Sequence, residues 1–162
     1  MNILGYNRVI KNLNGLTEKQ FLILIKTNFK IYKLSKPTKP NNKNHISMLL
    51  NGNWYSLKVK NKIINNDPVK GLDADILQKY ILKPILGIVN PRTNTNIDFV
   101  GGVRGLEELE SRCNIDSKVA FALYPVSIED IIAVADANKV MPPKSTWFEP
   151  KLRSGLVVRI LN

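Results

Sequence analysis

The sequence predicts an α+β domain, in which about four helices cover a mixed β-sheet. A hairpin signal at 46–60 requires antiparallel pairing. Strand and helix patterns then alternate as β-α-β-α-β in the C-terminal half, which favours right-handed crossovers and parallel pairing there. The 162 residues can bury one substantial core, and no linker or repeat divides them, so we expect one domain over 1–162.

The first elements follow from local patterns. Loose alternation predicts a strand over 3–13. Thr17 and Gln20 form a capping-box pair, and apolar spacing carries the predicted helix to about Asn28. Alternation returns over 29–34, which predicts a second strand, and a polar loop with two prolines follows over 35–44.

The hairpin is the clearest local prediction. Two β-rich runs flank Asn51-Gly-Asn53, a tight-turn signal. Alternation in the second run predicts one buried and one solvated face. The expected core face carries Tyr55, Leu57 and Val59, and the expected solvated face carries Trp54, Ser56, Lys58 and Lys60.

The second half begins with a helix capped by Asp73 and ended by Pro84. A short strand at 97–100 leads through a glycine-rich turn into a helix with an acidic outer face. Residues 119–126 are apolar on both faces, which predicts a central strand. Residues 156–161 form the last predicted strand.

Another capped helix follows the predicted central strand. Ser127 is its expected N-cap, with Asp130 three residues later. Helical spacing predicts a buried stripe made of Ile128, Ile131, Ile132 and Ala135.

Composition excludes several classes of protein. No apolar run approaches the ~20 residues that a membrane-spanning helix needs. The first residues lack the basic and apolar regions of a signal peptide. The single Cys113 cannot form an intrachain disulfide and fits a reducing compartment. We therefore expect a cytoplasmic protein without membrane association.

The net charge of +11 is uneven along the chain. Residues 1–60 contain eleven Lys or Arg and a single acid, Glu18, whereas the remainder is nearly balanced. Such asymmetry can mark a nucleic-acid surface. The cations are mostly single lysines among asparagines, which an AT-rich genome would also produce, so composition alone favours drift over nucleic-acid binding.

The segment 141–156 carries the most unusual chemistry. Lys144-Ser145-Thr146 suggests a phosphate-binding loop, but Pro142 and Pro143 stand where that loop needs glycine amides. An anion could still be held by side chains, namely those of Lys144, Ser145, Thr146, Lys151 and Arg153. The alternative, slightly favoured by residue chemistry, is a rigid structural segment whose aromatic residues fill the core.

A second candidate is the turn Gly101-Gly-Val-Arg-Gly105. Free amides at a helix N-terminus can bind an anion, and Arg104 would reinforce Gly101 and Gly102 in this role. The dinucleotide-binding pattern lacks its first glycine, however. Tight packing of a helix against a strand is the favoured alternative.

No catalytic set is recognisable. Asp98, Asp136 and Glu149 are the carboxylates nearest these loops, and His45 is the only histidine. No Ser-His-Asp set, metal-ligand spacing or paired-carboxylate motif is present, so catalytic residues stay unassigned and we expect no metal and no evident cofactor.

Four ordered segments carry a resemblance to a known family. They read Tyr6-Asn-Arg-Val-Ile-Lys-Asn-Leu-Asn-Gly15, Asp98-Phe-Val-Gly-Gly-Val-Arg-Gly-Leu-Glu-Glu-Leu-Glu110, Ala120-Phe-Ala-Leu-Tyr-Pro-Val-Ser127 and the segment 141–156. Together they resemble the bacterial family known as domain of unknown function 1015. The likeness covers nearly the whole chain and is weakest at 35–66.

The resemblance implies that longer relatives carry an upstream half with an Asp-Gly-His-His-Arg motif, similar to a nucleotide-handling motif of the ParB/sulfiredoxin-like superfamily. Relatives often sit among serine-biosynthesis genes, and full-length relatives are expected to use a nucleotide as kinase-like phosphotransferases. This chain lacks a His-His pair, so it resembles only the C-terminal half, whether as the product of a split gene, a truncated copy or an excised piece of a longer protein.

We therefore expect a domain that completes an anion or phosphate site together with an N-terminal half of the same family, linked to serine metabolism. Two alternatives remain. One is a basic nucleic-acid-binding module, and the other is a stand-alone small metabolic enzyme. The residues leave open whether the chain alone is an enzyme.

Overall fold

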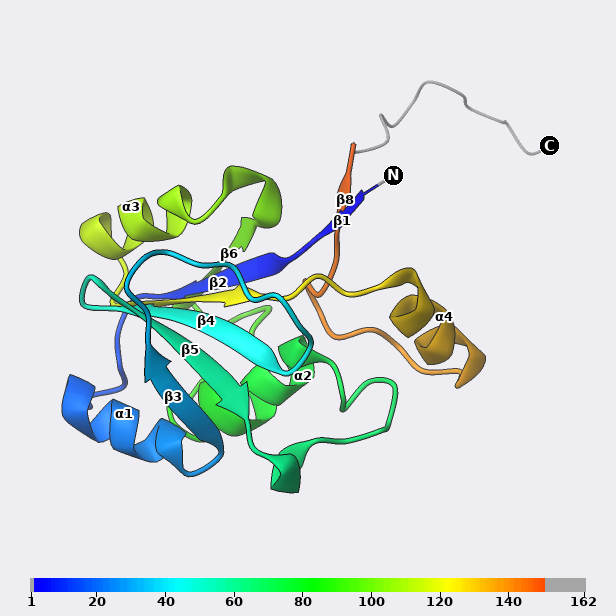
Figure 1. Cartoon of the computed structure of the whole chain (residues 1–162), viewed down its shortest axis with the longest axis horizontal. Helices are drawn as coiled ribbons and strands as arrows, with labels where there is room; N and C mark the ends of the chain where they lie inside the picture. Colours follow the sequence, from blue (N-terminus) through cyan, green and yellow to red (C-terminus); the bar gives the residue numbers. More distant parts are fainter. Residues whose placement is uncertain (1, 151–162) are drawn as a thin grey trace.

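The computed structural model describes residues 2–150, which form two antiparallel sheets and four α-helices (Figure 1). The strands are β1 (Asn2–Leu4), β2 (Tyr6–Ile10), β3 (Phe29–Lys33), β4 (His45–Leu50), β5 (Asn53–Val59), β6 (Ile97–Gly101), β7 (Val119–Leu123) and β8 (Trp147–Glu149). The helices are α1 (Glu18–Lys26), α2 (Asp73–Leu77), α3 (Glu107–Ile115) and α4 (Ile128–Asp136), and the π-helical turn Gln78–Leu82 continues α2.

Six strands form the main sheet in the order β3-β5-β4-β7-β2-β6. Each neighbouring pair is antiparallel, so the expectation of a mixed sheet is wrong, although the α+β class is confirmed. The hairpin expected at 46–60 is present as β4 and β5, with Asn51 and Gly52 at its turn in left-handed conformations.

The parallel pairing expected in the C-terminal half fails for a specific reason. β6 and β7 both run antiparallel to β2, so they point the same way, as a β-α-β crossover requires. β2 lies between them, however, and takes the hydrogen bonds that direct pairing would have used. A crossover pattern predicts the direction of two strands but not whether a third strand separates them.

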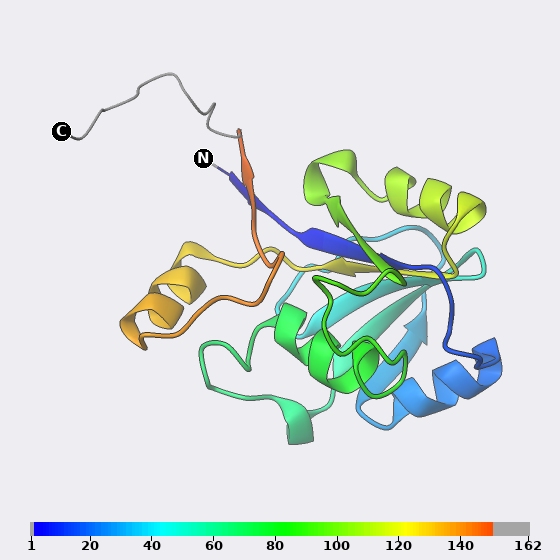
Figure 2. The ribbon, with the colours of Figure 1, turned by 180° about the vertical axis from the view of Figure 1, so that it is seen from behind.

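Helices cover both faces of the main sheet (Figures 1 and 2). α1, α2 and the turn after it pack on one face and bury the larger hydrophobic cluster, which includes Phe21, Ile76 and Phe121. α3 covers part of the other face through Leu109, which packs in a second cluster with Trp54. The central strand β7 is buried on both faces, as its apolar sequence predicts.

Two helix starts confirm the capping predictions. The Thr17 hydroxyl accepts the Gln20 backbone N–H, and the Gln20 side chain accepts the Thr17 backbone N–H. Ser127 and Asp130 make the same reciprocal pair at α4. Asp73 does not cap α2, because Leu72 holds the N-cap position and Asp73 is itself the first helical residue.

Two predicted faces are wrong. Trp54, expected in solvent, lies beneath α3 and donates from Nε1 to Glu110 at 2.9 Å, since this helix closes over the hairpin. Of the stripe predicted for α4, only Ile131 is partly buried, beside the buried Val134, whereas Ile128 and Ile132 are 52% and 53% exposed and Ala135 is also exposed. α4 touches the rest of the protein through a small cluster that includes Leu72 and Val126.

The N-terminal strand expected over 3–13 is divided at Gly5. β2 belongs to the main sheet, whereas β1 pairs with β8 in a two-stranded ribbon that projects from the domain (Figure 1). A Cβ at Gly5 would lie 2.3 Å from the Leu123 carbonyl oxygen, so only glycine fits at this bend. The predicted strand at 156–161 lies outside the described residues.

Among residues 2–150, no helix has the length and apolar character to cross a membrane.

Candidate functional site

The structure brings the described part of the predicted anion loop against β2. The Lys144 ammonium lies 5.5 Å from the Tyr6 ring centroid, a cation–π arrangement, and Lys144 has a left-handed backbone (φ 54°). Ser145 is buried and donates from Oγ to the Pro142 carbonyl at 2.7 Å. Thr146 is half-buried beside it. Lys151 and Arg153 lie outside the described residues.

The glycine turn is tightly packed. A Cβ on Gly101 would lie 2.5 Å from the Trp147 ring, and one on Gly102 would lie 2.5 Å from the Gly5 carbonyl oxygen. This geometry supports the packing alternative for both glycines. Arg104 is exposed and forms a 3.3 Å ion pair with Glu108 one helical turn later. Its role as an anion-contacting residue remains a prediction.

A cavity that the sequence analysis missed lies beneath Pro142 and Pro143. Its volume is about 170 Å³, and its other lining residues are Arg8, Val69, Ala74, Asp75, Gln78, Leu82, Pro91 and Phe99. The prolines of the predicted anion loop thus form one wall. β2, β6 and the α2 region form the others.

Arg8 is the unusual residue of this cavity, because its side chain is only 3% exposed. One guanidinium nitrogen donates to the Tyr6 carbonyl oxygen, and the group lies 5.6 Å from the Phe99 ring centroid. No carboxylate of residues 2–150 lies within ion-pair distance of it. Burial lowers the pKa of Arg8 to about 10, as expected for a cation removed from water.

The same cavity is also lined by a carboxyl group, that of Asp75, and by the side-chain amide of Gln78. Asp75 is half-buried, and this burial raises the pKa of its carboxyl group. Gln78 donates from Nε2 to the Ile88 carbonyl at 2.8 Å, while its buried Oε1 has no hydrogen-bond partner within the described chain. The cavity therefore combines a buried cation and a carboxylate that are not paired with each other.

A second buried charge lies nearby at the start of α2. Asp73 is 6% exposed, and one of its oxygens accepts the Asn44 backbone N–H at 2.8 Å. Burial is the main cause that raises the pKa of Asp73 to about 7. The adjoining hollow, also lined by Lys43, Asp130 and Ser145, is about 10 Å³, which leaves room for no more than roughly one water.

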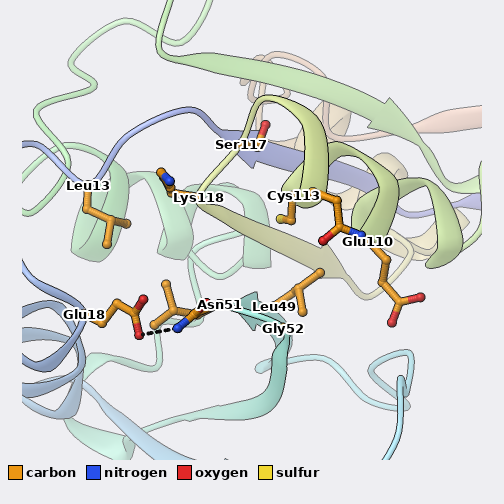
Figure 3. A pocket seen from close by; sticks show the side chains of 11 residues that line it. Leu13, Glu18, Leu49, Asn51, Gly52, Glu110, Cys113, Ser117 and Lys118 are labelled. Carbon is orange, nitrogen blue, oxygen red and sulfur yellow. Dashed lines mark hydrogen bonds between the residues drawn. The ribbon is translucent and has the colours of Figure 1, made fainter.

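Another hollow, of about 320 Å³, lies between α1, the β4–β5 turn and α3 (Figure 3). Glu18 and Glu110 stand on opposite sides of it and already accept hydrogen bonds from Asn51 and Trp54, respectively. Burial raises the pKa of Cys113 to about 11, so the thiol stays protonated. Lys118 also lines this hollow, but it forms no ion pair with Glu18 or Glu110.

The remaining candidates are held in structural contacts. Asp98 pairs with Arg112 at 2.9 Å, and Glu149 accepts from the Trp147 indole at 2.9 Å. Asp136 is exposed, and His45 is half-buried in β4. Within residues 2–150, no group of three or more His, Cys, Asp or Glu side chains is arranged to hold a metal ion.

One comparison with known proteins gave a match. The model of a family described as "Protein of unknown function (DUF1015)" matches residues 1–75. Because this match lies in the N-terminal part of the chain, it does not support the expectation that only the C-terminal half of a relative is present. Neither a curated protein nor a solved structure matches the chain.

Proposed function

We propose that this chain, whose residues 1–75 match the model of the DUF1015 family of proteins of unknown function, binds a small ligand with an anionic group in the Arg8 cavity. The best-fitting ligand class is a zwitterion, such as a free amino acid or its phosphate ester. Serine and phosphoserine are the first candidates, since the family resemblance implies a link to serine metabolism.

The burial of Arg8 without an ion-pair partner among residues 2–150 is the observation that carries this proposal. A buried guanidinium without a carboxylate is costly, and proteins normally pair such a cation. Its planar donors match a carboxylate or phosphate in a bidentate manner. A ligand anion in the cavity would supply the missing charge and accept the remaining N–H donors.

Asp75 accounts for the zwitterionic character of the ligand. It lines the same cavity as Arg8 but forms no ion pair with it. A carboxylate that is partly removed from water gains from a nearby positive group. A ligand ammonium directed to Asp75 and a ligand anion directed to Arg8 would satisfy both residues at once.

The segment 142–149 supports the site as its cover. Pro142 and Pro143 touch the cavity, and Ser145 stiffens the following turn through its bond to the Pro142 carbonyl. Lys144 has the only positive charge of residues 142–149, and Ser145 and Thr146 are its neighbours. In this proposal Lys144 steers anions toward the cavity rather than forming a backbone phosphate cradle.

The proposed partner is an N-terminal half of the same family, which would complete the site. The support is the apolar surface of α4, where Ile128 and Ile132 are more than half exposed and Val140 follows at 82%. Exposed aliphatic residues spaced four apart on one helix are typical of a docking face. Nucleotide binding, if any, belongs to this assembled form.

The experiment is a titration of the full chain with L-serine, O-phosphoserine, inorganic phosphate and ATP, followed by thermal shift and calorimetry. A ligand at ten times its Kd should stabilise the fold by about 1.4 kcal/mol. Arg8→Gln should abolish the shift, whereas Lys19→Gln, at an exposed lysine of α1 that does not line the cavity, should retain it.

Circular dichroism of each variant separates lost binding from lost folding. Serine binding without phosphate binding would support the zwitterion, because phosphate alone cannot engage Asp75. The proposal fails if none of the ligands shifts the folded protein, alone or with an added N-terminal half, or if folded Arg8→Gln binds as tightly as the parent chain.

A further inference from the structure

We propose that the face of the main sheet formed by β3, β5 and β4 binds single-stranded nucleic acid, with lysines contacting phosphates and Tyr32 stacking on a base. This function is separate from the Arg8 cavity. It uses the basic half of the chain and the part of the sheet beside α3, where the loop 35–44 covers Ser47 of β4 while Lys30, Tyr32 and Lys58 remain exposed.

The strand register creates the surface. Lys30 lies directly opposite Lys58, and Lys58 lies directly opposite His45 on its other side. Residues directly opposite in antiparallel strands share one face of a sheet, with Cβ atoms about 5 Å apart. Three basic side chains from β3, β5 and β4 therefore form one row, which we call the basic row.

The next row gives the surface its aromatic group. Tyr32 lies opposite Ser56, and Ser56 lies opposite Ser47. The Tyr32 side chain is 53% exposed, a high value for a large ring on a sheet face. Tyr32 belongs to none of the hydrophobic clusters of residues 2–150, whereas Trp54, one row further along, packs in a cluster with Leu109 of α3.

The positive charges of the two lysines in the basic row are not paired with carboxylates of residues 2–150. Both of these lysines, Lys30 and Lys58, are exposed. Like charges directly opposite one another destabilise a sheet. An arrangement that costs stability in the free protein is explained if an anionic partner occupies it.

The loop 35–44 adds cations beside the same face. The Ser47 hydroxyl donates to the Thr38 carbonyl oxygen at 2.6 Å, which holds this loop over the sheet on the side of α3. Lys36 and Lys39 belong to the loop. Positive side chains that contact the backbone, together with an exposed aromatic ring on which a base can stack, bind single strands without strict sequence preference.

The positive charge of the basic row favours a polyanion as the partner. The exposed Tyr32 ring favours a polyanion that has free bases, namely a single strand. A duplex keeps its bases stacked on one another and offers none to Tyr32, whereas a single strand presents free base faces. An acidic protein segment would match the charge but would not need the ring. The observations thus favour single-stranded RNA or DNA, which the test compares.

The test measures fluorescence anisotropy of labelled rU12 and dT12 with the full chain at several salt concentrations. Affinity should fall with salt, and each phosphate contact should contribute about 0.7 to the slope of log K against log salt. Lys58→Ala should lower that slope by about 0.7. Tyr32→Ala should weaken binding about 5- to 150-fold and leave the slope unchanged.

Lys19→Ala is the matched control, because this exposed lysine lies on α1, on the opposite side of the sheet. Lys30→Glu checks the geometry independently. It should abolish binding yet raise the melting temperature, since a Glu opposite Lys58 replaces repulsion with attraction.

Several results would overturn the proposal. One is the absence of saturable binding at 50 mM salt. Another is an equal loss of affinity in Lys19→Ala and Lys58→Ala, or an unchanged affinity in Tyr32→Ala. A labelled duplex or polyglutamate that binds as tightly as rU12 would also contradict it. A lowered melting temperature for Lys30→Glu would contradict the basic row itself.

Discussion

Replacing Asp73 by asparagine should remove a pH dependence of stability that one buried carboxyl group imposes. Asp73 is 6% exposed, one of its oxygens has no hydrogen-bond partner among residues 2–150, and the pKa of the group is raised from 3.8 to about 7. Lys43 opposes this increase, and Asp130 adds to it. Asparagine keeps an oxygen that can accept the Asn44 N–H but cannot ionise.

The sign follows from proton binding. Between pH 4 and pH 7 the native state holds a proton on Asp73 that the unfolded state has lost, so stability falls as pH rises through this window. The difference between pKa values of 3.8 and about 7 corresponds to about 4 kcal/mol when complete. Between pH 5 and pH 8 the contribution of Asp73 to the free energy of unfolding should fall by about 2–3 kcal/mol.

Urea denaturation at pH 5, 6, 7 and 8 gives the free energy of unfolding for the parent chain and for Asp73→Asn. The free energy of unfolding of the variant should rise relative to that of the parent with each step up to pH 7. Above pH 7 the difference between the two should stay nearly constant. Asp136→Asn, at an exposed acid on α4, should show no such divergence. Parallel curves for Asp73→Asn and the parent would refute the buried, uncompensated state of this carboxyl group.

Two further predictions test the packing. Gly101→Ala should destabilise the protein by about 1–3 kcal/mol, because the added Cβ would lie 2.5 Å from the Trp147 ring. Val103→Ala, at an exposed residue of the same turn, should change the stability by no more than about 0.5 kcal/mol. Equal urea midpoints for the two variants would contradict the close approach of Gly101 to Trp147. Cys113 should react slowly with a thiol reagent at pH 8 until the chain is unfolded, because burial raises its pKa to about 11; rapid labelling of the native protein would show an accessible thiolate instead.

Local signals were reliable where neighbouring residues alone decide the backbone. The capping boxes at Thr17 and Ser127 and the turn at Gly52 each satisfy their hydrogen bonds or dihedral needs within a few residues. Such features do not depend on the rest of the fold. The helix starts and the hairpin were therefore predictable.

Faces were less predictable, because burial depends on which element arrives from elsewhere. Trp54 alternates onto a face that a lone hairpin would expose, but α3 covers it. α4 shows the opposite case, since its regular apolar spacing predicts burial while Ile128 and Ile132 remain exposed. The periodicity of apolar residues identifies an apolar face of a helix or strand, but it does not show whether another element of the protein covers that face.

The candidate site shows the same division. Lys144 and Ser145 were identifiable from an unusual segment, and the prolines beside them do line a cavity. Arg8 was not identifiable, because one cation in a β-strand looks like an ordinary solvated residue. Its significance arises from burial beneath a loop more than 130 positions later in the chain.

The sequence by itself determined the α+β class, the helix caps, the hairpin and a central strand buried on both faces. These follow from interactions that span a few residues. Only the tertiary structure decided that β2 separates β6 from β7, that Arg8 is buried with no ion-pair partner among residues 2–150, and that Lys30 and Lys58 lie opposite each other. Each depends on strand register or on contacts between distant segments, and long-range packing leaves no signature in the local pattern.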